Sequence, residues 1–349
     1  SKSKGNVIDP LDIIEKYSAD ALRFTLLSMA SPGTDVKLSE DRVKGYRNFL
    51  NKIWNVNNFL KINKCKLKNI KKLPIIKTNI NKWIYLELTK TKKIVKKNLK
   101  DYRFDEASKN LYQFVWHSYC DWYLELTKTI FFSNNKKVIN EVKEVSAYVF
   151  KEVLIMLHPF IPFLTEEIWL KNKLDNNKKD FLMFTNWSEK SVKEDKDYKD
   201  VNKIINIISE IRSFKNQINV PPGSFIDLSL QKIKNKDKIF LKKNDVIIKK
   251  LGRINTFLDK DKNQQSATLV ISGDIFKLYF DQGIDLNLIK ENLLDKLKKT
   301  EVDLTKISER LANKAFVSRA PKNIVDQEKI NYSDLKKDLE KISLIIESL

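Results

Sequence analysis

An apolar repeat over residues 285–349 constrains the fold of this 349-residue chain more than any other sequence feature. Apolar residues recur there in alternating steps of about four and three, and the segment "NKAFVSRAPKN" interrupts the repeat once. The repeating positions are Leu293, Leu297, Thr300, Leu304, Ile307 and Leu311 before the interruption, and Leu335, Leu339, Ile342, Ile346 and Leu349 after it. This spacing is typical of helices that pack along one seam. We therefore predict an antiparallel coiled-coil hairpin with a short Pro-containing turn.

Helical spacing of apolar residues also runs through the first half of the chain. Helices are predicted over residues 9–30, 39–60, 79–98, 104–131 and 137–157, and a short helix from about residue 165. Pro32 and Gly33 end the first helix, while Ser39 and Thr165 are N-cap candidates for later ones. These helices predict an antiparallel bundle of four or five members that ends near residues 186–188.

The region between the bundle and the hairpin has a different pattern. A helix is predicted over residues 201–219, and strands follow in "NVPPGSFIDLSL" and on both sides of a Gly-Asp turn in "SATLVISGDIFKLYF". This is the pattern of a small α+β unit. The predicted fold is therefore mainly α, with domain limits at 1–38, 39–190, 191–284 and 285–349.

The formal net charge of +21 indicates a polyanionic partner such as a nucleic acid. Lys, Asn and Ile are all abundant and only eight of the 66 basic residues are Arg, so codons rich in A and T explain part of the excess. The distribution of charge is more informative than its sum. Residues 61–100 hold 14 lysines against the single acid Glu87.

Several classes of protein are excluded by composition. No apolar run approaches the ~20 residues that cross a bilayer, so we expect a soluble, cytoplasmic protein without a membrane partner. Cys65 and Cys120 are the only cysteines, and they stand far apart with His117 and His158 as the only imidazoles. We therefore predict reduced thiols and no zinc or other metal site. We also expect a monomer.

Four blocks of sequence carry a resemblance to a known family. "SKSKGN" resembles the latter part of the K-M-S-K-S loop of class I aminoacyl-tRNA synthetases, and the following "VIDPLDIIEKYSADALRFTLLSMASPGTDVKLSEDRVKGYRNFLNKIWN" resembles the valyl-tRNA synthetases. "YRFDEASKNLYQFVWHSYCDWYLEL" and "LHPFIPFLTEEIW" resemble their anticodon-binding bundle, and "ANKAFVSRAPKNIV" resembles the turn of their terminal coiled coil. The blocks occur in the family's order. Ser18 stands where the family often has Gly, which we interpret as a minor change within a helix.

The resemblance implies an ATP-dependent ligase of valine and tRNA(Val), with Mg²⁺ accompanying ATP. By position in the loop, Lys2 is the catalytic candidate, because a flexible cation stabilises charge on the phosphates. The implied ATP-binding residues are Ser1, Lys2, Ser3 and Lys4. The resemblance also implies that the chain is the C-terminal part of such an enzyme, cut inside the loop and inactive alone. ATP and valine would then be bound through the missing catalytic domain.

Two groups of basic residues are candidate tRNA contacts. Lys92, Lys93 and Lys96 recur along one predicted helix, and Arg310, Lys314, Arg319 and Lys322 bracket the hairpin turn. Aromatic residues can stack on unpaired bases. However, Phe114, Trp116, Tyr119, Trp122 and Trp169 follow helical spacing, and we interpret most of them as packing residues.

Two alternatives remain open at this point. The isoleucyl- and leucyl-tRNA synthetases share the loop and the bundle, although the hairpin after an α+β unit favours valine and the absence of a cysteine cluster argues against isoleucine. The other alternative is a stand-alone basic RNA-binding helical protein without an enzymatic role.

Overall fold

The chain divides into two compact units, residues 1–203 and 204–349. The computed structural model describes residues 9–33, 35–67, 73–172, 181–187, 196–264, 266–280, 284–313 and 322–349. The division falls inside helix α9 (Lys196–Gln217), which contributes residues to both units.

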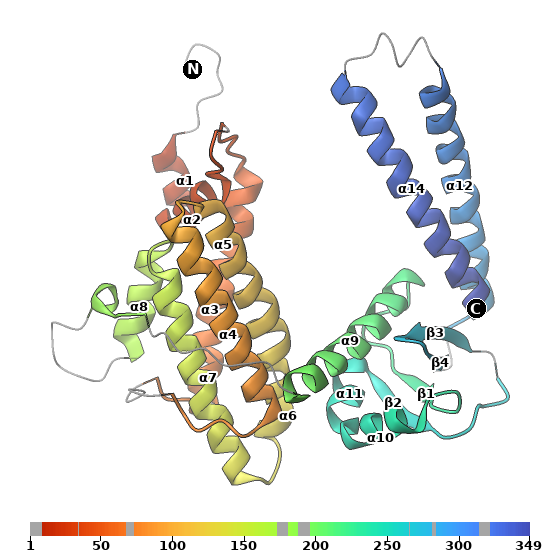
Figure 1. The fold of residues 1–349 in the computed structure, drawn as a ribbon, viewed down its shortest axis with the longest axis horizontal. Coiled ribbons are helices and arrows are strands. Elements are labelled where there is room, and N and C mark those ends of the chain that lie inside the picture. The colour runs from red at the N-terminus through yellow and green to blue at the C-terminus, as the bar shows by residue number, and fades with distance from the viewer. Residues whose placement is uncertain are drawn as a thin grey trace. The chain divides into compact units, whose positions relative to one another are not determined.

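The first unit is helical, and α3, α4, α5 and α7 form its bundle (Figure 1). The predicted long helices between residues 39 and 157 are confirmed in position, but residues 104–131 contain a π-helical segment that the spacing does not predict. The elements are α1 (Pro10–Tyr17), α2 (Ala19–Met29), α3 (Glu40–Ile62), α4 (Asn79–Lys100), α5 (Phe104–Gln113), the π-helix η2 (Phe114–Leu124), α6 (Glu125–Phe131), α7 (Lys136–Leu157), α8 (Pro162–Asn172) and the short 3-10 helix η3 (Leu182–Phe184).

A hydrogen-bonded network lies in the core of this bundle. The Tyr123 hydroxyl donates to Asn81 Oδ1 at 2.7 Å and accepts from Ser146 Oγ at 3.2 Å, while the Tyr119 hydroxyl donates to the Ser146 carbonyl at 2.9 Å. Both tyrosines are fully buried, and burial raises the pKa of each phenol. The network joins α4, η2 and α7, and it pairs polar groups that would be costly to bury alone.

The predicted first helix is broken at Ser18. Its backbone has φ 110° and ψ 153°, a combination that is almost restricted to glycine. Ser18 therefore ends α1 and begins α2, where its Oγ accepts the Ala21 N–H at 3.3 Å. The interpretation of Ser18 as a minor change within a helix is wrong, because the residue does not have helical geometry.

Helix α8 begins at Pro162, so the predicted start at Thr165 is wrong. Thr165 lies inside the helix, where its hydroxyl donates to the Ile161 carbonyl at 2.8 Å. The N–H groups of the first turn are instead paired with the carboxylate of Asp20, from α2. Asp20 Oδ1 accepts Phe163 N–H at 3.3 Å, and Oδ2 accepts Leu164 N–H at 2.6 Å.

Backbone N–H groups at the start of α4 also pair with a carboxylate from a distant helix. Glu141 of α7 accepts the N–H groups of Lys77 and Thr78 at 2.8 and 2.7 Å, and the Asn81 amide at 2.9 Å. Thr78 occupies the N-cap position but makes no side-chain capping bond. A carboxylate supplied by tertiary structure thus pairs the backbone N–H groups at and just before the N-cap position.

The second unit contains a small mixed sheet, as the strand patterns predict. Its elements are β1 (Ile226–Ser229), α10 (Asn235–Lys243), α11 (Asp245–Gly252), β2 (Ile254–Leu258), β3 (Ala267–Ile271) and β4 (Asp274–Phe280). The strand order is β2-β1-β4-β3, with β1 parallel to β2 and the other pairs antiparallel. The turn before β4 is Ser272–Gly273, one residue earlier than predicted, and both residues have positive φ.

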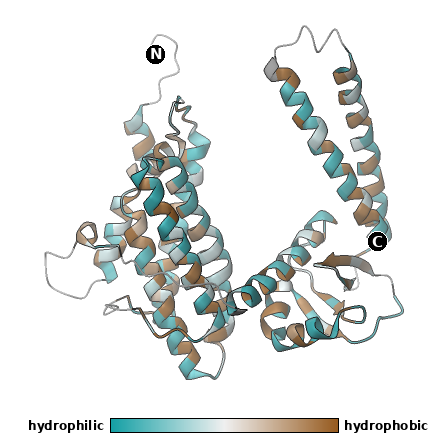
Figure 2. Ribbon diagram, viewed as in Figure 1, coloured by the Kyte–Doolittle hydropathy of each residue, from teal (hydrophilic) through white to brown (hydrophobic). Residues whose placement is uncertain are grey.

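The coiled-coil hairpin is confirmed. Helices α12 (Leu286–Ala312) and α14 (Lys322–Ser348) pack against each other, and Figure 2 shows hydrophobic and hydrophilic residues alternating along both. Every predicted seam residue is buried or half-buried. The Asp285 carboxylate caps α12 by accepting the N–H groups of Asn287 and Leu288 at 2.8 and 3.2 Å.

The geometry of Ser18 predicts a stabilising substitution. Ser18→Gly should raise the free energy of unfolding of the first unit by about 1 kcal/mol, because relief of backbone strain exceeds the entropic cost of glycine. Urea unfolding monitored by tryptophan fluorescence measures the change. Ser39→Gly is the matched control, because Ser39 has φ −122° and makes no side-chain capping bond. Equal destabilisation by both substitutions would contradict the assigned strain.

Candidate nucleic-acid interface

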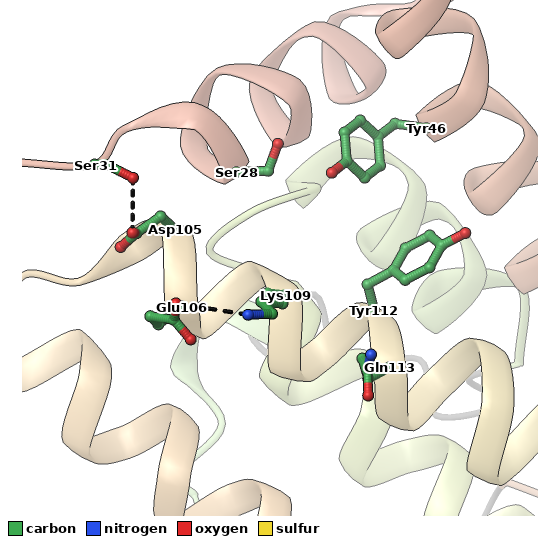
Figure 3. Close-up of a pocket in the computed structure, with 8 residues that line it drawn as sticks. All are labelled: Ser28, Ser31, Tyr46, Asp105, Glu106, Lys109, Tyr112 and Gln113. Atoms are coloured by element: carbon green, nitrogen blue, oxygen red, sulfur yellow. Dashed lines mark hydrogen bonds and ion pairs between the residues drawn. The ribbon is translucent and has the colours of Figure 1, made fainter. Parts of the chain in front are cut away.

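A polar pocket of about 320 Å³ lies between α2, α3 and α5 in the first unit (Figure 3). This volume falls at the lower end of the range for small-molecule sites. The lining residues combine hydroxyl, carboxylate, amide and ammonium groups with two phenol rings: Ser28, Ser31, Tyr46, Asp105, Glu106, Lys109, Tyr112 and Gln113. Nothing in the spacing of these residues along the sequence indicates that they share a pocket.

One end of the pocket is a fixed anion. Asp105 accepts two hydrogen bonds from the Arg103 guanidinium, at 2.9 and 2.8 Å, and one from the Ser31 hydroxyl at 2.9 Å. The Arg103 bonds, followed by the Ser31 bond, hold the pKa of the Asp105 carboxyl well below its ordinary value against the opposing effect of burial. Asp105 is therefore ionised at neutral pH and presents acceptor oxygens of fixed position.

The other end of the pocket is aromatic. The Tyr112 ring stacks on Trp116, with centroids 5.5 Å apart and an angle of 14° between planes, and it also contacts Phe49 at 4.9 Å. Tyr46 meets Tyr112 edge-on at 6.0 Å. Tyr46, Tyr112 and Trp116 are half-buried, so packing fixes their orientation while part of each ring reaches solvent. Such rings can stack on unpaired nucleobases.

The π-helix η2 carries the aromatic surface beyond the pocket. The Lys52 ammonium lies 3.9 Å from the centroid of the Trp116 ring and pairs with Asp121. His117 Nδ1 lies 3.4 Å from Asp121 Oδ2 on the same segment. π-helical segments often mark functional sites because they change which residues share a face. Here the segment brings a cation, an acid and an imidazole beside an indole ring.

The interpretation of most aromatic candidates as packing residues is confirmed for two of them. Phe114 and Tyr119 are buried, at 3% and 0% exposure, whereas Trp116 is half-buried. The spacing of Tyr112 and Trp116 by four residues was visible in the sequence as a possible stacked pair. Nothing in the sequence indicated that Ser31 would contact Asp105 or that Tyr46 would contact Tyr112.

The lysine group on α4 does not share one exposed face. Lys93 and Lys96 are exposed, but Lys92 is only 9% exposed and its ammonium pairs with the Glu152 carboxylate of α7. Among the three candidate tRNA contacts, Lys92 is therefore not an exposed cation, because its charge is compensated inside the bundle.

Near the hairpin turn, Arg310 Nη1 lies 3.5 Å from Glu328 Oε1 on the facing helix. Arg310 is 61% exposed and Glu328 is 18% exposed. The other basic candidates here are Lys314 and Arg319, which lie outside the described residues, as does the side chain of Lys322. Ser1, Lys2, Ser3 and Lys4 of the loop also lie outside them.

Three family models match the chain in succession. Residues 1–39 match tRNA synthetases class I (I, L, M and V), residues 81–230 match the anticodon-binding domain of tRNA ligase, and residues 285–349 match the valyl tRNA synthetase tRNA binding arm. A valine–tRNA ligase of Pelagibacter ubique is 64% identical over 349 residues, all of this chain and 40% of that protein. The chain is similar along its whole length to part of the valine–tRNA ligases.

More distant relatives show the same similarity. Valine–tRNA ligases of Bartonella quintana and Bartonella henselae are 40% and 39% identical over all of this chain, and each match covers 39% of the relative. The chain thus spans about 40% of the length of the curated relatives it matches. Because the family model for the arm is specific to valyl-tRNA synthetases, it favours valine over the isoleucyl and leucyl alternatives.

Two further findings concern only the part of the chain that the structure describes. None of its helices is long and apolar enough to span a bilayer. No group of three or more His, Cys, Asp or Glu side chains lies close enough to hold a metal ion.

The pKa of Asp105 predicts a pH-dependent effect on stability. Because the folded-state pKa is lowered, ionised Asp105 stabilises the fold above the unfolded pKa, near 4, and this contribution is lost as the pH falls through the lower, folded value. Asp105→Asn should reduce the free energy of unfolding at pH 7 by about 2 kcal/mol, which is typical of hydrogen bonds to a charged group.

Urea unfolding at pH 7 and at pH 3 measures this effect, and the difference from the unmodified chain should shrink at pH 3. Glu106→Gln is the control from the same pocket, since Glu106 is 39% exposed and its ion pairs with Arg103 and Lys109 are both long, at 3.8 Å. A difference that persists unchanged at pH 3 would contradict the assignment.

Proposed function

We propose that this chain is the C-terminal, tRNA-binding part of a valine–tRNA ligase. The full-length enzyme would activate valine with ATP and transfer it to tRNA(Val), with Mg²⁺ accompanying ATP. The main support is the succession of the three family models along a chain that is 64% identical throughout to a protein named valine–tRNA ligase.

The proposal gives each part of the chain a role. Residues 1–38 are the end of the catalytic module, 39–190 the anticodon-binding bundle, 191–284 a small linking domain and 285–349 the arm. In the first part, Ser1, Lys2, Ser3 and Lys4 would contact ATP, and Lys2 would stabilise charge on the phosphates during activation. The support for these four residues is their resemblance to the K-M-S-K-S loop. We propose that the enzyme acts as a cytoplasmic monomer.

Two surfaces would contact tRNA. In the first unit, the pocket with its Tyr112–Trp116 stack suits an unpaired base, and Lys93 and Lys96 would attract the phosphate backbone. In the second unit, Arg310, Lys314, Arg319 and Lys322 would place positive charge at the end of the arm. The helix α12 has 27 residues, which corresponds to a stem of about 40 Å at a rise of ~1.5 Å per residue.

A binding assay on the isolated chain tests the choice of partner. We expect tRNA(Val) to bind, and the affinity to fall by about tenfold or more between 50 and 200 mM salt, because several phosphate contacts release counterions. Fluorescence anisotropy with labelled tRNA measures the affinity. The chain alone should give no valine-dependent ATP–pyrophosphate exchange. Equal affinity for heparin and tRNA at moderate salt would favour the stand-alone basic protein instead.

The stacking role of the pocket is tested by a substitution. Tyr112→Ala should weaken tRNA(Val) binding by about tenfold, because stacking of one base on an aromatic ring contributes about 1–3 kcal/mol. Tyr112→Phe keeps the ring and should retain the affinity. Phe132→Ala is the control, since Phe132 is 83% exposed at the end of α6, away from the pocket-lining residues. Unchanged affinity in Tyr112→Ala would rule out the pocket as a base site.

A further inference from the structure

Within the first unit, helix α2 joins two modules of the family. It lies in residues 1–39, which match the class I synthetase model, and its side chains contact residues of the anticodon-binding model, which covers residues 81–230. Some of these contacts are made with α5, and the polar ones of α2 with the corner between α7 and α8. The geometry of this corner therefore contributes to the way the end of the catalytic module is attached to the bundle.

Asp20 is the central polar residue of the attachment. It is 3% exposed, and its two carboxylate oxygens accept the N–H groups of Phe163 and Leu164, which lie more than 140 residues away in sequence. These N–H groups belong to the first turn of α8, where they have no partner within the helix. A carboxylate at this position is also favoured by the positive end of the helix dipole.

Neighbouring contacts hold α2 to the same corner. Arg23 Nη2 donates to the Pro159 carbonyl at 3.1 Å, and the fully buried Phe24 ring lies 6.0 Å from the Phe160 ring. Together with Asp20, these residues occupy one side of α2 over little more than one turn. The attachment thus has an anionic, a cationic and an apolar component.

A histidine at the corner between α7 and α8 interacts electrostatically with Asp20. His158 lies beside it and is held by Thr165, with Nδ1 and Oγ1 2.9 Å apart, and His158 Nε2 is 3.9 Å from Glu166 Oε2. Burial raises the pKa of Asp20, while the two N–H groups and the charges of Arg23 and His158 oppose that shift. The substitution Asp20→Asn is nearly isosteric. However, the side-chain amide N–H groups would then face the backbone N–H groups of α8, and two donors cannot form a hydrogen bond.

We propose that Asp20 is a positioning residue that fixes the catalytic module to the anticodon bundle, so that a tRNA bound on the bundle presents its acceptor end correctly for charging. The inference rests on the proposed function. The inference predicts different effects on two steps of the reaction. Activation of valine needs only the catalytic module, whereas charging of a complete tRNA needs both modules in the correct relative position. A misplacement of about 1 Å can cost roughly 100-fold in rate.

The test uses the full-length enzyme with Asp20→Asn. Valine-dependent ATP–pyrophosphate exchange should remain within about twofold of the unmodified enzyme, while kcat/KM for tRNA(Val) should fall about 10- to 100-fold. A minihelix that contains only the acceptor and T stems should be charged within about twofold of its normal rate, because it does not reach the bundle. Asp12→Asn is the control, since Asp12 is an exposed acid of α1 within the same family match.

Two results would overturn the inference: equal loss with tRNA and minihelix, or no loss with either. Should Asp20→Asn fail to fold, as judged by circular dichroism, Arg23→Gln removes the bond to the Pro159 carbonyl and should give a smaller loss, still confined to the complete tRNA. Failure of the proposed function itself is distinguishable, because the unmodified enzyme would then neither activate valine nor charge tRNA(Val).

Discussion

The helical bundle depends on the pairing of backbone N–H groups at the starts of its helices. Three carboxylates from other elements provide this pairing: Asp20 at α8, Glu141 at α4 and Glu166 at η3, where it accepts the Leu182 N–H at 3.0 Å. Each acid is ionisable yet at least half-buried, a placement that is tolerable because each carboxylate accepts at least one backbone N–H group. The same bonds that satisfy the helix starts also fix which helices lie side by side.

This arrangement explains how much of the fold could be predicted. Apolar periodicity is a local signal, and it located the long helices and many seam positions of the arm, although it missed the buried Val325 and Ile345. The start of α8 was misplaced because Thr165 is a good local cap, whereas the group that caps the helix is Asp20, supplied by a distant helix. The break at Ser18 was missed for a similar reason, since serine does not signal positive φ as glycine does.

The candidate site was likewise predictable from the sequence only in part. Neighbouring lysines in sequence can have opposite environments, and Lys92 is buried against Glu152 while Lys93 is exposed, a distinction that depends on a partner 60 residues away. The pocket was not predicted because Ser31, Tyr46 and Asp105 come from separate elements that meet only in the folded bundle. The resemblance of the loop, bundle and arm to a known family carried the functional prediction much further than composition or charge did.

The seam of the arm is not uniform along its length. Near the turn it includes the buried Val325 but also Glu328, whose Oε2 is buried and has no hydrogen-bond partner among the described residues, whereas Leu293 and Ile342 are buried apolar residues near the other end. A polar layer packs less favourably than an apolar one. The hairpin should therefore open more readily at the turn, and amide hydrogens there should exchange with solvent sooner. Under the proposed function, an arm that loosens at one end would adapt that end to the curvature of a folded RNA while the opposite end remains wound.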